Sequence, residues 1–159
     1  MTPHIYLYRG KRLLSALIRW QTRSRYSHAS MASPDDHTLV IEAWQGRGVH
    51  KTHIRNWDDI DAFCVVKVTE DQHRAAWAWA NLQLGLGYDY LGVLRFVSRT
   101  RGRENKRWFC SELVYQALQA AGLSLLRDIE AWAVSPALLA LSPYMMQLNQ
   151  TGINYEHHA

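Results

Sequence analysis

The most informative stretch of this 159-residue chain reads Trp108-Phe109-Cys110-Ser111-Glu112-Leu113-Val114-Tyr115. Apolar side chains recur every three or four residues from Cys110 to Ala121, and Gly122 follows. This spacing predicts a helix over 110–121 with one buried face, ended by the glycine. Cys110 then lies in the first turn, where unpaired backbone N–H groups and the positive end of the helix dipole favour a thiolate. The same N–H groups can stabilise an oxyanion.

Segments upstream of this helix predict an antiparallel sheet. Runs rich in β-branched, aromatic or small residues predict strands at 5–8, 26–32, 38–44, 49–55 and 63–68. The turn sequence Ser33-Pro34-Asp35-Asp36 joins the second and third runs as a hairpin. Helices are expected over 11–23, 70–84 and 91–97, the second one opened by the capping-box residues Thr69 and Gln72. The pattern predicts an α+β fold with an antiparallel sheet of four to six strands packed against helices.

Composition favours one globular domain spanning residues 1–159. Apolar residues make up 48% of the chain, seven tryptophans are present, and no linker-like stretch divides the sequence. Neither a secretion signal nor an apolar segment of membrane-spanning length is recognisable, so we expect a cytoplasmic protein. In that compartment the two cysteines, Cys64 and Cys110, stay reduced, and a reactive thiol is chemically permitted.

Three segments together resemble a known family: Tyr26-Ser27-His28-Ala29, Val40-Ile41-Glu42-Ala43 and Phe109-Cys110-Ser111-Glu112-Leu113-Val114. They are similar to the circularly permuted branch of the NlpC-type papain-like superfamily, the YiiX-like and YebB-like proteins related to lecithin:retinol acyltransferase-like proteins. In ordinary papain-like chains the cysteine helix precedes the sheet that bears the histidine. The permuted branch reverses that order, as this chain does. The resemblance implies a permuted papain-like fold with the nucleophile at the N-terminus of a late helix.

Carried onto this chain, the resemblance implies that Cys110 is the nucleophile, His28 the general base and later acid, and Glu42 the orienting group. Chemistry makes the same demand, because a thiol that attacks a carbonyl needs an adjacent imidazole, and a third group fixes the ring of that imidazole. His28 and Glu42 fall on adjacent predicted strands, so a cross-strand contact is geometrically available.

Three further residues are candidates for the pocket or the oxyanion site. Tyr88, in the segment Tyr88-Asp89-Tyr90, matches a segment that resembles one in the family, and it is expected to line the pocket or to offer its hydroxyl. Tyr26 lies two residues before His28 and hence on the same strand face. Ser111 is expected to contribute its backbone N–H.

The implied function is a cysteine hydrolase (amidase or peptidase) or an acyltransferase, acting on an amide, ester or thioester through an acyl-enzyme. The substrate is expected to be a peptide-like or lipid acyl small molecule, and no external cofactor is needed. We expect no metal site, because His50 and His53 point to opposite faces of a strand and the cysteines lack zinc-ligand spacing.

Two basic segments leave other functions possible for this chain. Six basic residues surround Glu104 between Arg95 and Arg107, which favours a solvated loop over an anionic-ligand or nucleic-acid-binding module. The basic amphipathic segment 11–23 either packs on the domain or touches a membrane surface. A catalytically silent member of the fold, with Cys110 serving only as a core residue, is the remaining alternative. The sequence leaves the oligomeric state open.

Overall fold

The computed structural model describes residues 4–10, 13–90 and 107–148. The predicted helix at 91–97 and the basic loop up to residue 106 lie outside the described residues. In chain order the elements are β1 (Ile5–Tyr8), α1 (Leu13–Thr22), β2 (His28–Ala32), β3 (Leu39–Trp44), β4 (Gly48–His53), β5 (Ile60–Val65), α2 (Glu70–Asn81), β6 (Gly87–Tyr88), β7 (Arg107–Trp108), α4 (Cys110–Ala120), the 3-10 turn η1 (Ala131–Ala133), α5 (Pro136–Ala140) and β8 (Met145–Gln147).

The predicted α+β class and the antiparallel sheet are confirmed. Six strands pair in the order β4-β3-β2-β1-β5-β8, and every pairing in this sheet is antiparallel. The short strands β6 and β7 form a separate parallel pair. β1 lies at the centre because its sequence, Ile-Tyr-Leu-Tyr, is apolar on both faces and can be covered from both sides.

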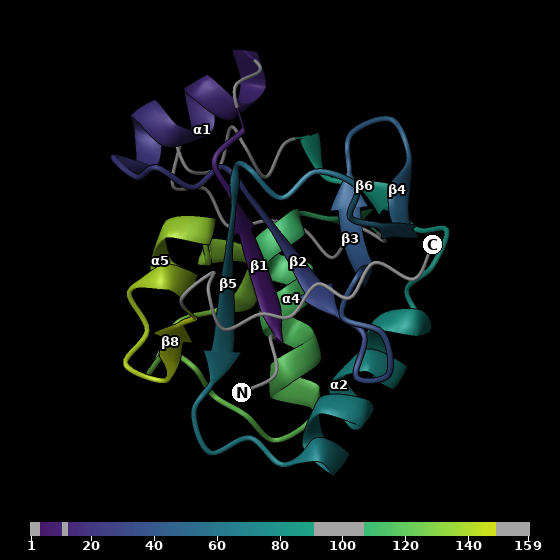
Figure 1. Cartoon of the computed structure of the whole chain (residues 1–159). Coiled ribbons are helices and arrows are strands. Elements are labelled where there is room, and N and C mark those ends of the chain that lie inside the picture. Colours follow the sequence, from purple (N-terminus) through teal and green to yellow (C-terminus); the bar gives the residue numbers. More distant parts are fainter. Residues whose placement is uncertain (1–3, 11–12, 91–106, 149–159) are drawn as a thin grey trace.

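The main core lies between the sheet and α4, which stands behind β1 and β2 in Figure 1. Ile5 and Leu7 of β1 contribute to this core, whereas Tyr6 joins a smaller cluster on the opposite face of the sheet. Leu113 and Leu118 of α4, both 1% exposed, complete the predicted apolar helix face. Gly122 ends the helix with a left-handed φ of 78°, a conformation that glycine adopts without strain.

Some boundaries differ from the sequence prediction. The strand predicted at 63–68 is β5 at Ile60–Val65, because the chain turns at Lys67, whose φ is 62°. The helix predicted at 70–84 ends at Asn81, and its Thr69–Gln72 capping box is present. Helix α5 and strand β8 were not predicted, although Ser135 as N-cap and Pro136 in the first turn are helix-start signals.

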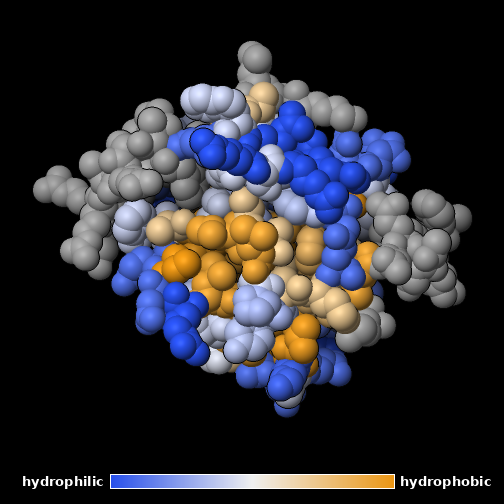
Figure 2. Space-filling model, turned by 90° about the vertical axis from the view of Figure 1, so that its left-hand side faces the viewer, coloured by the Kyte–Doolittle hydropathy of each residue, from blue (hydrophilic) through white to orange (hydrophobic). Residues whose placement is uncertain are grey.

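Several large hydrophobic side chains are exposed on the surface. Figure 2 shows hydrophobic side chains gathered on the face that carries α5 and β8, and the exposed large side chains of that segment are Leu141, Tyr144 and Met146. In α1, Ile18 is buried and packs on the domain, whereas Trp20 is 75% exposed. In the described part of the chain, no helix has the length and hydropathy that crossing a membrane requires.

Candidate active site

Cys110 is the first residue of α4 and is only 1% exposed. The preceding residue, Phe109, has extended backbone dihedrals, and its N–H donates to Oε2 of Glu112 at 3.3 Å. The N–H of Leu113 makes the backbone hydrogen bond of the first helical turn, to the carbonyl of Phe109 at 3.0 Å. The N–H groups of Cys110 and Ser111 precede that bond, so the helix itself does not use them. The sulfur therefore sits beside backbone donors suited to an oxyanion.

His28 and Glu42 form a close buried pair. Nε2 of His28 donates to Oε2 of Glu42 at 2.6 Å, and both residues are 7% exposed. Because a carboxylate can only accept, the proton of this bond belongs to Nε2. Nδ1 is then the ring nitrogen that remains for Cys110, which is near enough to influence the pKa of His28.

The charges at this site favour the imidazolium form of His28. Burial opposes a charged ring, but the negative charges of Cys110 and Glu42, together with hydrogen bonds to both, raise the pKa of His28 to about 10. For Glu42, burial likewise opposes ionisation, yet the charge and hydrogen bond of His28 lower the pKa of the carboxyl group below its usual value. Cys110 and Glu42 thus both act on the pKa of the His28 ring.

Two aromatic residues that the sequence analysis missed hold the His28 ring. The ring centroid of Tyr8 lies 5.0 Å from that of His28, and Trp44 packs edge-on at 4.7 Å. The Tyr8 hydroxyl shares a hydrogen bond of 2.8 Å with Oγ of Ser30. A sequence signal existed for Trp44, because it follows Glu42 by two residues on the same strand and so shares its face. Tyr8 could be found only from the register that pairs it with His28.

A cavity of about 190 Å³ opens onto His28. Its lining includes Tyr8, Trp44 and Tyr88, with Ile18 from α1 on one side. The expected pocket position of Tyr88 agrees with this lining. Burial first, and then the nearby charge of Cys110, raise the pKa of Tyr88, so its hydroxyl keeps its proton and can act as a donor.

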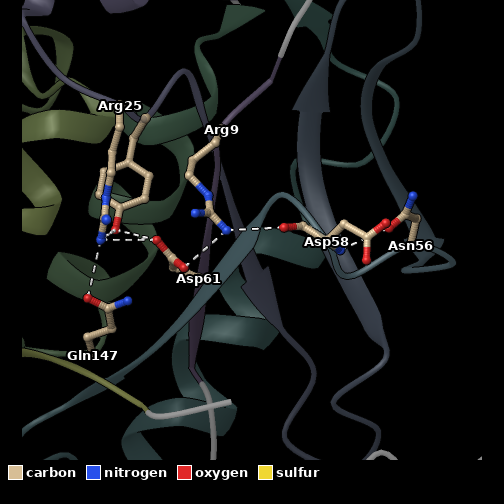
Figure 3. A network of polar contacts seen from close by, with 7 residues as sticks. Arg9, Arg25, Asn56, Asp58, Asp61 and Gln147 are labelled. Atoms are coloured by element: carbon tan, nitrogen blue, oxygen red, sulfur yellow. Dashed lines mark hydrogen bonds and ion pairs between the residues drawn. The ribbon is translucent and has the colours of Figure 1, made fainter.

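Tyr26 and Ser111 have other partners for their hydroxyl groups. Tyr26 donates to Oδ2 of Asp61 at 2.7 Å and is not among the residues that line the His28 cavity. Figure 3 shows how Asp61 is approached from two sides by Arg9 and Arg25, at 3.6 Å and 3.2 Å. Tyr26 therefore anchors the entry to β2 rather than reaching the pocket. The Ser111 hydroxyl donates to the carbonyl of Val134 at 2.6 Å, which leaves only its backbone N–H for the site.

The second cysteine lies in a different environment. Cys64 borders a cavity of about 420 Å³ together with His4 and His73. Burial raises the pKa of Cys64 and lowers the pKa of His4 to about 4. Burial also lowers the pKa of His73, whose Nε2 donates to a backbone carbonyl at 2.9 Å. The neutral imidazoles and the protonated thiol of this cavity contrast with the charged pair of His28 and Glu42.

Among known proteins, similarity to this chain is found in the fold and not in the sequence. The sequence matches no protein-family model and no curated protein. The structure is similar to the crystal structure of the metalloprotein yiiX from Escherichia coli O157:H7, described as DUF1105, with a TM-score of 0.73 and 19% sequence identity. The alignment covers 94% of this chain and 96% of that chain. The fold of this chain is therefore YiiX-like.

Proposed function

We propose that this chain is a cysteine-nucleophile hydrolase or acyltransferase in which Cys110 attacks, His28 transfers protons and Glu42 orients His28. The observation that carries the proposal is the buried His28–Glu42 hydrogen bond of 2.6 Å, with Cys110 close enough to the same imidazole to help raise its pKa. A cysteine at a helix start beside an imidazolium is the arrangement that activates thiol nucleophiles.

In the proposed reaction the Cys110 thiolate adds to a carbonyl carbon, and the carbonyl electrons move onto the oxygen. N–H groups at the start of α4 stabilise that oxyanion, and Tyr88 is a second candidate donor. The intermediate collapses, the bond to the leaving group breaks, and His28 gives the leaving group its proton. Water or an acceptor nucleophile then attacks the thioester, returns a proton to His28 and releases the Cys110 thiolate.

The chain order of the three residues fits the permuted papain-like branch. His28 begins β2, Glu42 lies in β3 and Cys110 begins α4, so the histidine strand precedes the cysteine helix. The likeness to the yiiX structure over nearly the whole of both chains supports the same family proposal. Amide, ester and thioester carbonyls of peptide-like or lipid acyl molecules are the proposed substrate class.

The likeness to a structure described as a metalloprotein raises the question of a metal in this chain. Across residues 4–10, 13–90 and 107–148, no group of three or more His, Cys, Asp or Glu side chains is placed to hold a metal ion. Among the residues that the structure describes, the donor set does not fit a metal centre, and the proposed mechanism uses none.

Activity-based labelling tests the proposal without knowledge of the natural substrate. Wild-type protein and the variants Cys110→Ala, His28→Ala and Cys64→Ala are treated with an alkyne-bearing thioester, and the modified residue is mapped by mass spectrometry. We expect acylation of Cys110 in the wild type and in Cys64→Ala, none in Cys110→Ala, and a rate at least about 100-fold lower in His28→Ala. Acylation of Cys110 that is independent of His28, or a label confined to Cys64, would overturn the proposal.

A further inference from the structure

A second histidine contacts the carboxylate of Glu42. His50 on β4 is the register partner of Glu42 on β3, and its Nε2 lies 3.5 Å from Oε1 of Glu42. Oε2 of the same carboxylate accepts from His28 at 2.6 Å. The two oxygens of Glu42 are thus divided between two imidazoles, one on each neighbouring strand.

The hydrogen bond at the other ring nitrogen of His50 shows which nitrogen carries a proton. Its Nδ1 lies 3.1 Å from the carbonyl oxygen of Gly48, and a carbonyl oxygen only accepts, so Nδ1 carries a proton. An ion pair between Nε2 and Oε1 of Glu42 requires the charged ring, in which both nitrogens carry a proton. The backbone of β4 itself orients the ring, because Gly48 and His50 belong to the same strand.

We propose that His50 is a positioning residue that holds the second carboxylate oxygen of Glu42 and so fixes the carboxylate facing His28. This inference rests on the proposed function of the Cys110 site. A carboxylate bonded at one oxygen can rotate about its terminal bond, whereas contacts at both oxygens set its plane. His50 acts through Glu42 and His28, and it touches neither the sulfur nor the reacting carbonyl.

The same strand offers a matched control. His53 also lies beside a carboxylate, with Nε2 3.3 Å from Oδ2 of Asp36. Its side chain is 62% exposed, whereas that of His50 is 20% exposed. An exposed pair of this kind contributes little, so a change at His53 tests for general effects of removing a histidine from β4.

The experiment measures the rate at which iodoacetamide alkylates Cys110, with mass mapping of the adduct. The variants are His50→Leu, which removes both donors, His50→Gln, which keeps a side-chain amide donor, and His53→Leu as the control. His50→Asn, whose amide is one methylene shorter, replaces His50→Leu if that variant does not fold. Each single change at His50 is repeated in the Glu42→Gln background, which gives a double-mutant cycle.

We expect His50→Leu to slow alkylation about fivefold, the upper end for a partly exposed ion pair, while His50→Gln and His53→Leu stay close to the wild-type rate. In the Glu42→Gln background the change at His50 should have no further effect. An equal loss in both backgrounds, or no loss with either His50→Leu or His50→Asn, would overturn the inference. Failure of the proposed function appears separately, as an alkylation rate that His28→Ala leaves unchanged.

Discussion

Nε2 of His28 lies 2.6 Å from Oε2 of Glu42, although the paired part of the β2–β3 ladder ends at Met31 and Ile41. If that register continued, Ser30 rather than His28 would stand opposite Glu42. The two residues therefore meet on a diagonal of one sheet face, which long side chains can span. The contact depends on side-chain orientation and not on backbone pairing. Its effect on the pKa of His28 and on the reactivity of Cys110 can therefore be tested by changing single functional groups.

Replacing Glu42 with Gln keeps the shape of the side chain and removes its charge. Because the charge of Glu42 helps to raise the pKa of His28 to about 10, the variant should show a lower pKa for His28. We expect alkylation of Cys110 near neutral pH to slow by about tenfold. Nitrogen-15 chemical shifts of the histidines, followed against pH, measure the first effect directly. A His28 pKa that does not move would mean that Glu42 has no electrostatic role.

Tyr88→Phe separates oxyanion stabilisation from pocket lining. If the hydroxyl donates to the oxyanion, acylation of Cys110 by a thioester should slow by about tenfold or more. Alkylation by iodoacetamide displaces iodide at a saturated carbon and forms no oxyanion, so its rate should be unchanged. Comparison of the two rates in the same variant is the measurement. Equal rates of acylation in wild type and Tyr88→Phe would leave Tyr88 as a lining residue only.

Stability should fall in mild acid because of His4. Its pKa is lowered from 6.5 to about 4, mainly by burial. Between these values the unfolded chain binds a proton that the folded chain does not, so this residue costs stability as pH falls from 6.5 towards 4. Nδ1 of His4 accepts from the N–H of Val65 at 2.8 Å, and His4→Asn keeps an acceptor there without titrating in this range. Unfolding free energies measured against pH should show a shallower acid decline in this variant.

Tyr26→Phe should destabilise the fold by about 1–2 kcal/mol, because the buried Asp61 carboxylate loses a hydrogen-bond donor. The bond that it removes is 2.7 Å long, and Asp61 is 6% exposed. Tyr144→Phe, at a residue 49% exposed, is the matched control and should change stability little. Denaturant unfolding followed by fluorescence gives both values. Equal effects in the two variants would contradict the anchoring role assigned to Tyr26.

Chelation should leave the reaction intact. Treatment with EDTA, followed by removal of the chelator and its metal, is expected to change neither the rate nor the site of thioester labelling at Cys110. The reason is that the proposed mechanism uses only the charges and hydrogen bonds of Cys110, His28 and Glu42. Loss of labelling that returns when zinc is added would show that a metal takes part.

Much of the fold and part of the candidate site could be predicted from the sequence. The helix that begins at Cys110 was predictable because its apolar period is local, and the capping box at Thr69 was legible for the same reason. The candidates His28 and Glu42 came from short segments that resemble a family, and the structure brings both together with Cys110. Tyr26 was given a pocket role from strand periodicity alone, which cannot tell that its hydroxyl reaches Asp61, 35 positions away in the chain.

By itself, then, the sequence determined most of the strands and helices, though not α5 or β8, and which cysteine begins a helix, because periodicity and capping act over a few neighbouring residues. Only the tertiary structure decided the strand order β4-β3-β2-β1-β5-β8, the packing of Tyr8 and Trp44 on the His28 ring, and the second contact of Glu42 with His50. Those relationships depend on strand register and side-chain direction between segments distant in the chain, which no local pattern records.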